Sequence, residues 1–276
     1  MNPYSNQTAM FYQMNPLAWA FHRATAHALS AQSPAKVTPS ANSPNAEYVR
    51  AGQMKEYLGV EKQALPVPEH LRGALGKAIA ERRSCRRFAN TALPFVSMST
   101  LLHGAYGLGA KYLHGTLEMF DRPVPSGGGC YPLELYVLAQ NIERVATGVH
   151  HYSIRHRALE LIGPLPQPEA IVSLFLGQSW LAKAHAIVVI TAVAPRLLER
   201  YGDRGYRYLL IEAGHVGQNL ALLATAMGLG SLSLGGFYDD EVACLLGLDP
   251  AFEIPLYGVA LGVPDTPDSA EARGLT

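Results

Sequence analysis

The chain has 276 residues, of which 49% are apolar, enough to bury a sizeable core as one large domain or two small ones. Lysine plus arginine number 22, as do aspartate plus glutamate, so the formal net charge is zero. This balance argues against a general nucleic-acid or membrane-surface binder, because such proteins are basic overall. It leaves room for a local basic pocket. The longest uncharged apolar run, residues 184–194, is too short to span a bilayer.

The three cysteines, Cys85, Cys130 and Cys244, are widely spaced and form no C-x-x-C pair. They predict neither a disulfide framework nor a zinc site, and they favour a reducing, cytoplasmic setting. His150 and His151 lie in a predicted strand, where successive side chains point to opposite faces. We therefore expect no metal site.

The N-terminal part of the chain is expected to be an arm. Residues 1–14 contain no lysine, no arginine and no long apolar run, so they do not predict a signal peptide. Residues 16–29 have the spacing of a short amphipathic helix, and residues 30–45 have the Ser, Pro, Ala and Asn content of a linker. We divide the chain into this arm, residues 1–56, and a main domain, residues 57–276.

The main domain mixes helical and strand patterns. Helices are predicted from apolar spacing and from proline or glycine at the ends, over residues 69–82, 99–106, 204–227 and 239–246. Strands are predicted at residues 134–139, 149–152, 158–162, 185–193, 231–237 and 254–261. The nearly continuous Ile/Val run at 185–193 suits a strand buried on both faces. These elements indicate an α+β fold.

The helix predicted at residues 204–227 is apolar on more than one face and ends at Gly228. A helix that is apolar almost all round must be buried on several sides. In a chain of this size, one way to bury it is against a second copy of the chain.

Four arginines gather within six positions directly after a predicted helix: Arg82, Arg83, Arg86 and Arg87. Guanidinium groups this close repel one another unless an anion neutralises them, and their planar forks suit a phosphate. The alternative is an exposed basic helix end whose charges pair with Glu81 and other neighbours.

A glycine-rich loop follows at residues 125–132, with the sequence Pro-Ser-Gly-Gly-Gly-Cys-Tyr-Pro. Its glycines let backbone N–H groups approach a flat ligand, although an ordinary turn is the alternative. Gly235 and Gly236 repeat the pattern at the end of a predicted strand, where a β-bulge is the alternative. The loop is neither a Walker A nor a Rossmann fingerprint. Arginines for a phosphate and glycines for a planar ring together fit flavin mononucleotide (FMN).

Residues 200–208 are dense in arginine and tyrosine and open the predicted long helix. Such side chains donate protons or hold anions, and Asp203 is a candidate helix cap. The alternative is a capped helix start with aromatic surface packing.

With these segments identified, the chain resembles the nitroreductase superfamily of flavoproteins, and more closely its branch of SagB-type dehydrogenases and thiazoline oxidases. The resemblance runs from about Phe21 to Gly262. It is carried by Phe21-His22-Arg23-Ala24-Thr25, Arg83-Ser84, Pro125-Ser126-Gly127-Gly128 with Tyr131 to Tyr136, Gly148 to Tyr152, Arg204 to Tyr208, Glu212-Ala213-Gly214-His215, Gln218-Asn219, Gly228-Leu229-Gly230 and Gly235-Gly236-Phe237.

The resemblance implies a central, mainly antiparallel sheet flanked by helices, in an intertwined homodimer with FMN at the subunit interface. The long helix would form the dimer core. By position, the FMN phosphate, ribityl chain and one ring edge would be held by Arg82, Arg83, Ser84 and Arg86, with Arg273 as the C-terminal basic residue. The ring would be flanked by Pro125, Ser126 and Gly127 of the other subunit and approached on its N5 side by Leu234, Gly235 and Gly236.

The azoline-oxidising members of this branch carry an adjacent Lys-Tyr pair, which is matched here by Arg200 and Tyr201. These two residues are the candidate catalytic pair. Arginine stays protonated at any working pH, so Arg200 cannot act as a general base. It can lower the pKa of Tyr201 or orient a carbonyl or carboxylate of the substrate. Arginine in place of the family lysine argues against standard azoline oxidation, but it does not argue against flavin redox chemistry.

Three functions follow from these features. The first is an FMN-dependent dehydrogenase or oxidase acting on a heterocycle, such as a thiazoline or oxazoline, or on an amino-acid-derived unit in peptide natural-product biosynthesis. Its substrate would be a small molecule, a peptide or a carrier-bound group. The second is an NAD(P)H-dependent nitro or quinone reductase, favoured by Arg200, Arg204 and Arg207. The third is a non-catalytic flavin-binding subunit of a biosynthetic complex.

Overall fold

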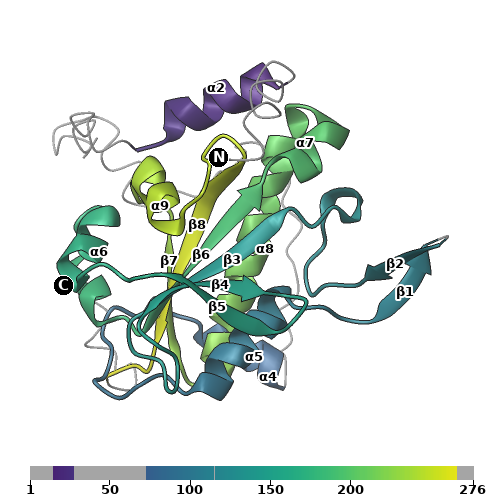
Figure 1. Cartoon of the computed structure of the whole chain (residues 1–276). Helices are drawn as coiled ribbons and strands as arrows, with labels where there is room; N and C mark the ends of the chain where they lie inside the picture. The colour runs from purple at the N-terminus through teal and green to yellow at the C-terminus, as the bar shows by residue number, and fades with distance from the viewer. Residues whose placement is uncertain (1–14, 28–72, 115, 266–276) are drawn as a thin grey trace, which may run out of the picture.

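The computed structural model describes residues 15–27, 73–114 and 116–265 (Figure 1). The linker at residues 30–45, the expected domain boundary at residue 57 and the candidate Arg273 lie outside the described residues.

A six-stranded sheet forms the centre of the molecule, and its strands follow the order β5-β4-β3-β6-β8-β7. Every neighbouring pair is antiparallel. The strands are β3 (Leu133–Ala139), β4 (Gly148–Ser153), β5 (Ala158–Gly163), β6 (Ala186–Val193), β7 (Gly230–Leu234) and β8 (Glu253–Gly262). The predicted α+β fold with a mainly antiparallel sheet is therefore confirmed.

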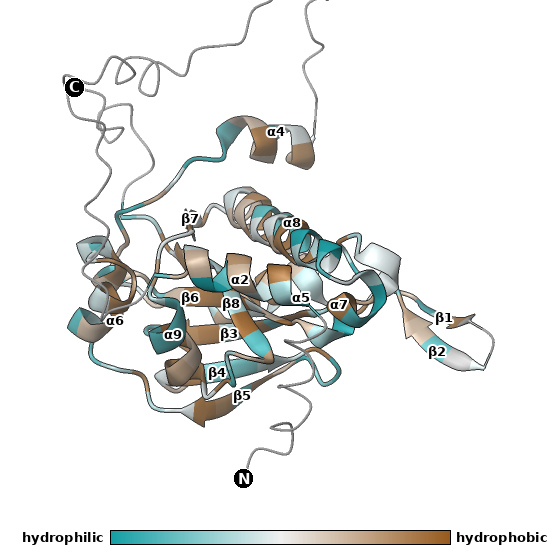
Figure 2. Ribbon diagram, turned by 90° about the horizontal axis from the view of Figure 1, so that it is seen from above, coloured by the Kyte–Doolittle hydropathy of each residue, from teal (hydrophilic) through white to brown (hydrophobic). Residues whose placement is uncertain are grey.

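Strand β6 is buried along all eight of its residues, as its Ile/Val run predicted. It pairs with β3 on one side and β8 on the other, so that Val188 lies between Val137 and Val259. Val188 and Ile190 join one hydrophobic cluster, while Ile187 and Val189 join a second cluster on the opposite face. Burying each such side chain contributes about 1.5–3 kcal/mol. The sheet interior is correspondingly hydrophobic in Figure 2.

Helices cover both faces of this sheet. The helices are α2 (Pro16–Thr25), α4 (Ala74–Glu81), α5 (Phe95–Tyr106), α6 (Pro168–Leu174), α7 (Pro195–Tyr201), α8 (Arg204–Ala226) and α9 (Asp239–Leu246), with 3₁₀ turns η1 (Gly127–Gly129) and η2 (Ser179–Lys183). Side chains of α5 and α8 belong to the first cluster, and side chains of α6 and α9 belong to the second. Among the helices that the structure describes, none is long and apolar enough to cross a membrane.

Several elements differ from the sequence expectations. The hairpin of β1 (Lys111–His114) and β2 (Leu117–Phe120) was not predicted, and it projects from the body in Figure 1. Helix α6 was not predicted either, and the strand expected at 231–237 ends at Leu234.

The long helix predicted at residues 204–227 is confirmed as α8 (Arg204–Ala226), but the separate helix α7 that precedes it was not predicted. Arg200 and Tyr201 end the separate helix α7, and α8 begins at Arg204. Gly202 makes the break, because its φ of +55° lies in a region that glycine adopts at little cost. The corner points Tyr201 back toward the glycine-rich loop.

Asp203 was predicted to cap the long helix, but it caps a different one. It makes no side-chain capping bond to α8, and its Oδ1 instead accepts a hydrogen bond of 2.7 Å from the Ala18 N–H in the first turn of α2. The carboxylate thus satisfies an N–H group that has no partner inside its own helix. His22 and the Tyr206 hydroxyl, 3.0 Å apart, add a second link from α2 to α8.

Replacing Asp203 by alanine is expected to loosen α2 and to lower the free energy of unfolding by about 1 kcal/mol, the usual cost of losing a helix cap. Hydrogen exchange of residues 15–27 should accelerate while exchange in β6 stays slow. The matched control is Asp240→Ala, which removes an exposed ion pair between α9 and Arg23 of α2 and should change less. Equal effects of the two variants would contradict the capping role.

Candidate functional site

The glycine-rich loop lines a cavity of about 380 Å³ at the N-terminal end of α8. The cavity is open on one side and is lined by Pro125, Ser126, Gly127, Tyr201, Tyr208, Ile211, Glu212 and His215. The structure therefore brings the three predicted loop residues together with the predicted Tyr201. Tyr208, Ile211, Glu212 and His215 were missed as site residues, although Glu212 and His215 stand in one of the resemblance motifs.

The loop is shaped by its contact with the corner between α7 and α8. Gly128 has a φ of +60°, and a Cβ atom there would lie 2.6 Å from both Arg200 Nη1 and the Tyr201 hydroxyl. Only glycine fits this position without displacing both side chains. Arg200 Nη1 also donates a hydrogen bond of 3.1 Å to the Gly128 carbonyl. Arg200 thus holds the loop, while Tyr201 lines the cavity.

Aromatic rings form one wall of the cavity. The rings of Tyr201 and Tyr208 meet edge to face with centroids 5.2 Å apart. Arg200 lies 5.5 Å from the Tyr201 ring centroid, and Arg204 lies 5.8 Å from that of Tyr208. These are cation–π distances, so both guanidinium groups are held against the aromatic wall.

A buried carboxyl group fixes the loop to α8. Glu212 is 2% exposed; its Oε2 accepts from the Ser126 hydroxyl at 2.6 Å and its Oε1 from the Tyr106 hydroxyl at 2.9 Å. The Ser126 oxygen in turn accepts from the Tyr131 N–H at 2.9 Å, and the Tyr106 oxygen from the Leu133 N–H at 3.2 Å. Burial raises the pKa of Glu212. One carboxyl group therefore positions both ends of the loop.

The arginine-rich segment lies elsewhere, beside edge strand β7. The Cys85 N–H donates a hydrogen bond of 2.9 Å to the Ser231 carbonyl, and Ser84 pairs with Ser231 as an isolated bridge. This pairing sets the predicted phosphate-binding residues along the strand that leads to Leu234, Gly235 and Gly236. Gly235 has open space where a side chain would stand.

The arginines of this segment have different surroundings. Arg83 Nη1 donates to the carbonyls of Ala80 and Arg82, and Arg87 forms an ion pair of 3.6 Å with Asp265.

The guanidinium groups of Arg82 and Arg86, in contrast, form no hydrogen bond or ion pair with any residue in the described part of the chain. Glu81, the alternative partner, lies instead 4.0 Å from Lys77. Two positive charges are thus left for an anion.

The loop and the arginine segment sit at opposite ends of α8. Gly127 lies against Tyr208 near the start of the helix, whereas Cys85 packs against Gly230 just beyond its end. From Tyr208 to Ala226 the helix advances by 18 residue steps, a rise of about 27 Å. No residue from 82–86 or 234–236 lines the cavity at the loop. Within the single chain, the two groups of predicted site residues do not line a common cavity.

Comparison with known proteins identifies the family of this chain. The nitroreductase family matches residues 79–263, about two thirds of the chain. The chain belongs to the nitroreductase family. A predicted nitroreductase of Methanocaldococcus jannaschii, MJ1384, is 35% identical over 189 residues, covering 68% of this chain and 90% of that protein. The expected membership of the superfamily is therefore confirmed.

A second relative is named for a peptide-processing role. The microcin B17-processing protein McbC of Escherichia coli is 36% identical over 140 residues, 49% of this chain and 52% of McbC. The chain thus matches about half of McbC. A chain of the E. coli microcin synthetase McbBCD complex with truncated pro-MccB17 bound superposes with a TM-score of 0.73 at 24% identity, over 95% of this chain and 97% of that one. This second likeness concerns the fold.

The charge state of Glu212 should shape the pH dependence of stability. A carboxyl group whose pKa is higher in the folded than in the unfolded chain weakens the fold as pH rises from about 4.5, because the unfolded chain releases its proton first. The Glu212→Gln variant lacks this effect, so its stability should fall less between pH 4.5 and 7. Urea unfolding of both proteins at several pH values measures the difference. Parallel curves would show that folding does not raise the pKa of Glu212.

Proposed function

We propose that this protein is an FMN-dependent dehydrogenase or oxidase that oxidises a heterocycle, such as a thiazoline or oxazoline, or an amino-acid-derived unit of a peptide natural product. The observation that carries the proposal is the cavity in which Tyr201 meets the glycine-rich loop that Arg200 holds. Membership of the nitroreductase family and the relative McbC support an oxidoreductase with a role in peptide processing.

The residues present fit an FMN molecule. Arg82 and Arg86 supply guanidinium groups without a described partner, beside Arg83 and Ser84, for the phosphate and ribityl chain. The open space beside the Gly235 backbone suits a flat ring. Arg273 stays a prediction outside the described residues. When bound, FMN would supply the acceptor for the hydride.

A homodimer would join the two separated groups of residues. Leu210 and Ile211 of α8 are 41% and 57% exposed, and Ile211 also borders the cavity at the loop. An apolar pair exposed beside a cavity marks a surface that gains stability when covered. We propose that a second copy packs there and that Pro125, Ser126 and Gly127 of one subunit flank the ring held by Arg82 and Arg86 of the other.

In the reaction that we propose, Tyr201, or a water molecule that it positions, removes the acidic proton next to a carbonyl group of the substrate. Arg200 stays charged and orients a substrate carbonyl or carboxylate while it holds the Gly128 carbonyl. Tyr208 and Ile211 form apolar walls that exclude water from the reacting groups. The protein thereby supplies position and electrostatics, and the redox step belongs to the cofactor.

A second candidate is an NAD(P)H-dependent nitro or quinone reductase. Arg200, Arg204 and Arg207 are near one another in sequence at the α7–α8 corner, and Arg204 and Arg207 are exposed on α8. Such a group suits an anionic dinucleotide donor.

The absorbance spectrum of the purified protein, recorded before and after anaerobic NADPH, separates these functions. We expect flavin bands that NADPH does not bleach, and a loss of turnover on azoline substrates of at least about 100-fold in Tyr201→Phe, the contribution typical of a general base. Bleaching by NADPH would favour the reductase. Absence of flavin bands even after FMN is added, together with full turnover of Tyr201→Phe, would refute the proposal.

Mixing two defective variants tests whether the FMN site is shared. Arg82→Ala/Arg86→Ala damages the proposed phosphate end, and Gly127→Leu fills the loop end, where an added Cβ would lie 3.4 Å from the side chains of Leu197 and Tyr208. After the two are unfolded and refolded together, half of the dimers are mixed and carry one intact site, so about a quarter of all sites should bind FMN.

Each variant refolded alone should bind FMN at least about tenfold more weakly than the parent. Arg155→Ala, which removes an exposed arginine at the β4–β5 turn, is the matched control and should bind normally. No recovery in the mixture would place both ends of the site in one subunit.

A further inference from the structure

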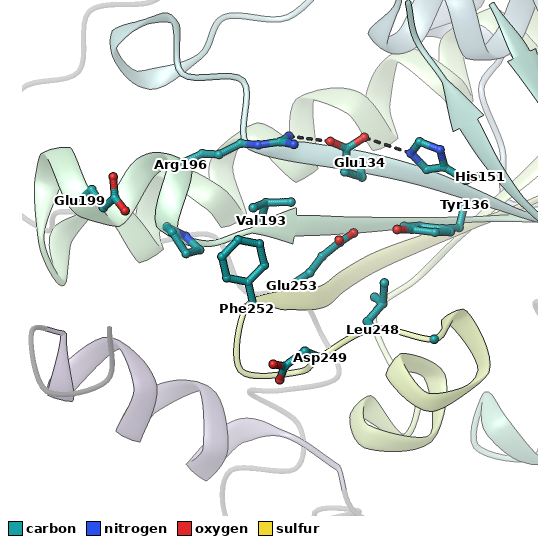
Figure 3. A pocket seen from close by; sticks show the side chains of 12 residues that line it. Glu134, Tyr136, His151, Val193, Arg196, Glu199, Leu248, Asp249, Phe252 and Glu253 are labelled. Atoms are coloured by element: carbon teal, nitrogen blue, oxygen red, sulfur yellow. Dashed lines mark hydrogen bonds and ion pairs between the residues drawn. The ribbon is translucent and has the colours of Figure 1, made fainter. Parts of the chain in front are cut away.

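A second cavity, of about 1000 Å³, lies at the end of the sheet where β3 and β8 begin and β6 ends (Figure 3). Strand residues Glu134, Tyr136, Val193 and Glu253 line it, and the start of α7 and the loop between α9 and β8 complete the lining. It shares no lining residue with the cavity at the glycine-rich loop. It is therefore a different cavity from the one on which the proposed function rests.

The positive charges of this cavity already have partners. Arg196 Nη1 donates to Glu134 Oε1 at 2.5 Å, and His151 Nε2 lies 3.2 Å from Glu134 Oε2. The second ring nitrogen of His151 lies 2.9 Å from the Glu160 carboxylate. The hydrogen bond to Glu134 is the main cause that raises the pKa of His151 to about 9, so the imidazole is charged at neutral pH.

The carboxyl group of Glu253, in contrast, is hydrogen-bonded only to hydroxyl groups among the described residues. Its Oε1 accepts a hydrogen bond of 2.5 Å from the Thr191 hydroxyl, and the Tyr136 hydroxyl is its second partner. Both partners are neutral, and no described arginine, lysine or histidine is hydrogen-bonded to this carboxyl group. Burial is the main cause that raises its pKa, and the nearby Glu134 charge adds to the effect. In Figure 3 the carboxyl group points into the space beside Tyr136.

Part of the remaining lining of this cavity is apolar. Val193, Pro195, Leu248 and Phe252 form the walls, from β6, α7 and the α9–β8 loop. Glu199 and Asp249 also border the cavity, so four carboxyl groups face it against two cations, Arg196 and His151. Glu134 binds both cations directly, and the Arg196 charge also acts on Glu253, so the carboxyl groups of the lining outnumber its cations.

We propose that this cavity binds an organic cation, an ammonium or guanidinium group on a short apolar stem, with Glu253 as its counter-charge. A carboxylate has about four acceptor positions, and two neutral donors leave room for a bound cation. The stem would pack on the apolar walls as lysine and arginine side chains do on protein surfaces. The same chemistry belongs to a free polyamine and to a basic side chain of a peptide.

Calorimetric titration of the full chain with agmatine at pH 7 tests this proposal. The parent protein should bind agmatine, and Glu253→Gln should bind it at least about tenfold more weakly, the effect of losing one charge-assisted hydrogen bond. The glutamine keeps an acceptor for Thr191, so the fold should survive. Glu169→Gln, on the exposed side of α6 away from the cavity, is the matched control and should bind as the parent does.

A second titration uses the capped peptide acetyl-Gly-Arg-Gly-amide and distinguishes the two sources of the cation. Tighter binding of the peptide than of agmatine would assign the site to a basic side chain, and the reverse would assign it to a free polyamine. Three results would overturn the proposal: no agmatine binding by the parent, equal affinity of a folded Glu253→Gln variant, or preferential binding of the dianion glutarate. None of them depends on flavin binding.

Discussion

The two-sided burial of β6 is the constraint from which the rest of this architecture follows. Because alternate residues of one strand enter two different cores, the sheet needs helices on both of its faces. Helix α8 covers one face and carries the cavity at the glycine-rich loop at its N-terminal end. The chain then leaves β6 directly into α7, whose first residues border the second cavity and whose last residue borders the first.

Features set by local patterns could be predicted from the sequence. The Ile/Val run of β6, the glycine that ends α8 and the short helix α9 were all evident, because each depends on neighbouring residues. That Asp203 caps α2 and not α8 was not evident, because a carboxylate beside a helix start is expected to cap that helix when only its neighbours in sequence are considered. Its actual partner, Ala18, lies 185 positions away in the sequence.

The candidate site shows the same division. The glycines and arginines allowed the loop and the basic segment to be predicted. The role of Glu212 was not predicted, because this residue lies within an apolar helix. A lone carboxyl group among buried residues is a usable signal, because it must find hydrogen-bond donors somewhere. Here the donors are Ser126 and Tyr106, which precede it by 86 and 106 positions. That the loop and the basic segment lie at opposite ends of α8 could not be predicted, because it depends on the long-range contacts of Gly127 with Tyr208 and of Cys85 with Gly230.

The two tryptophans of this chain lie near different groups of candidate site residues and can report on them by fluorescence. The chain contains two tryptophans, and α2 carries one of them, Trp19, which stacks on His22 at 5.6 Å beside the α7–α8 corner. The other, Trp180, lies 6.4 Å from Phe88, the residue that follows the basic segment. Each end of the molecule that bears a group of candidate site residues thus has its own fluorophore. Single-tryptophan versions would report on the two ends separately, without any added label.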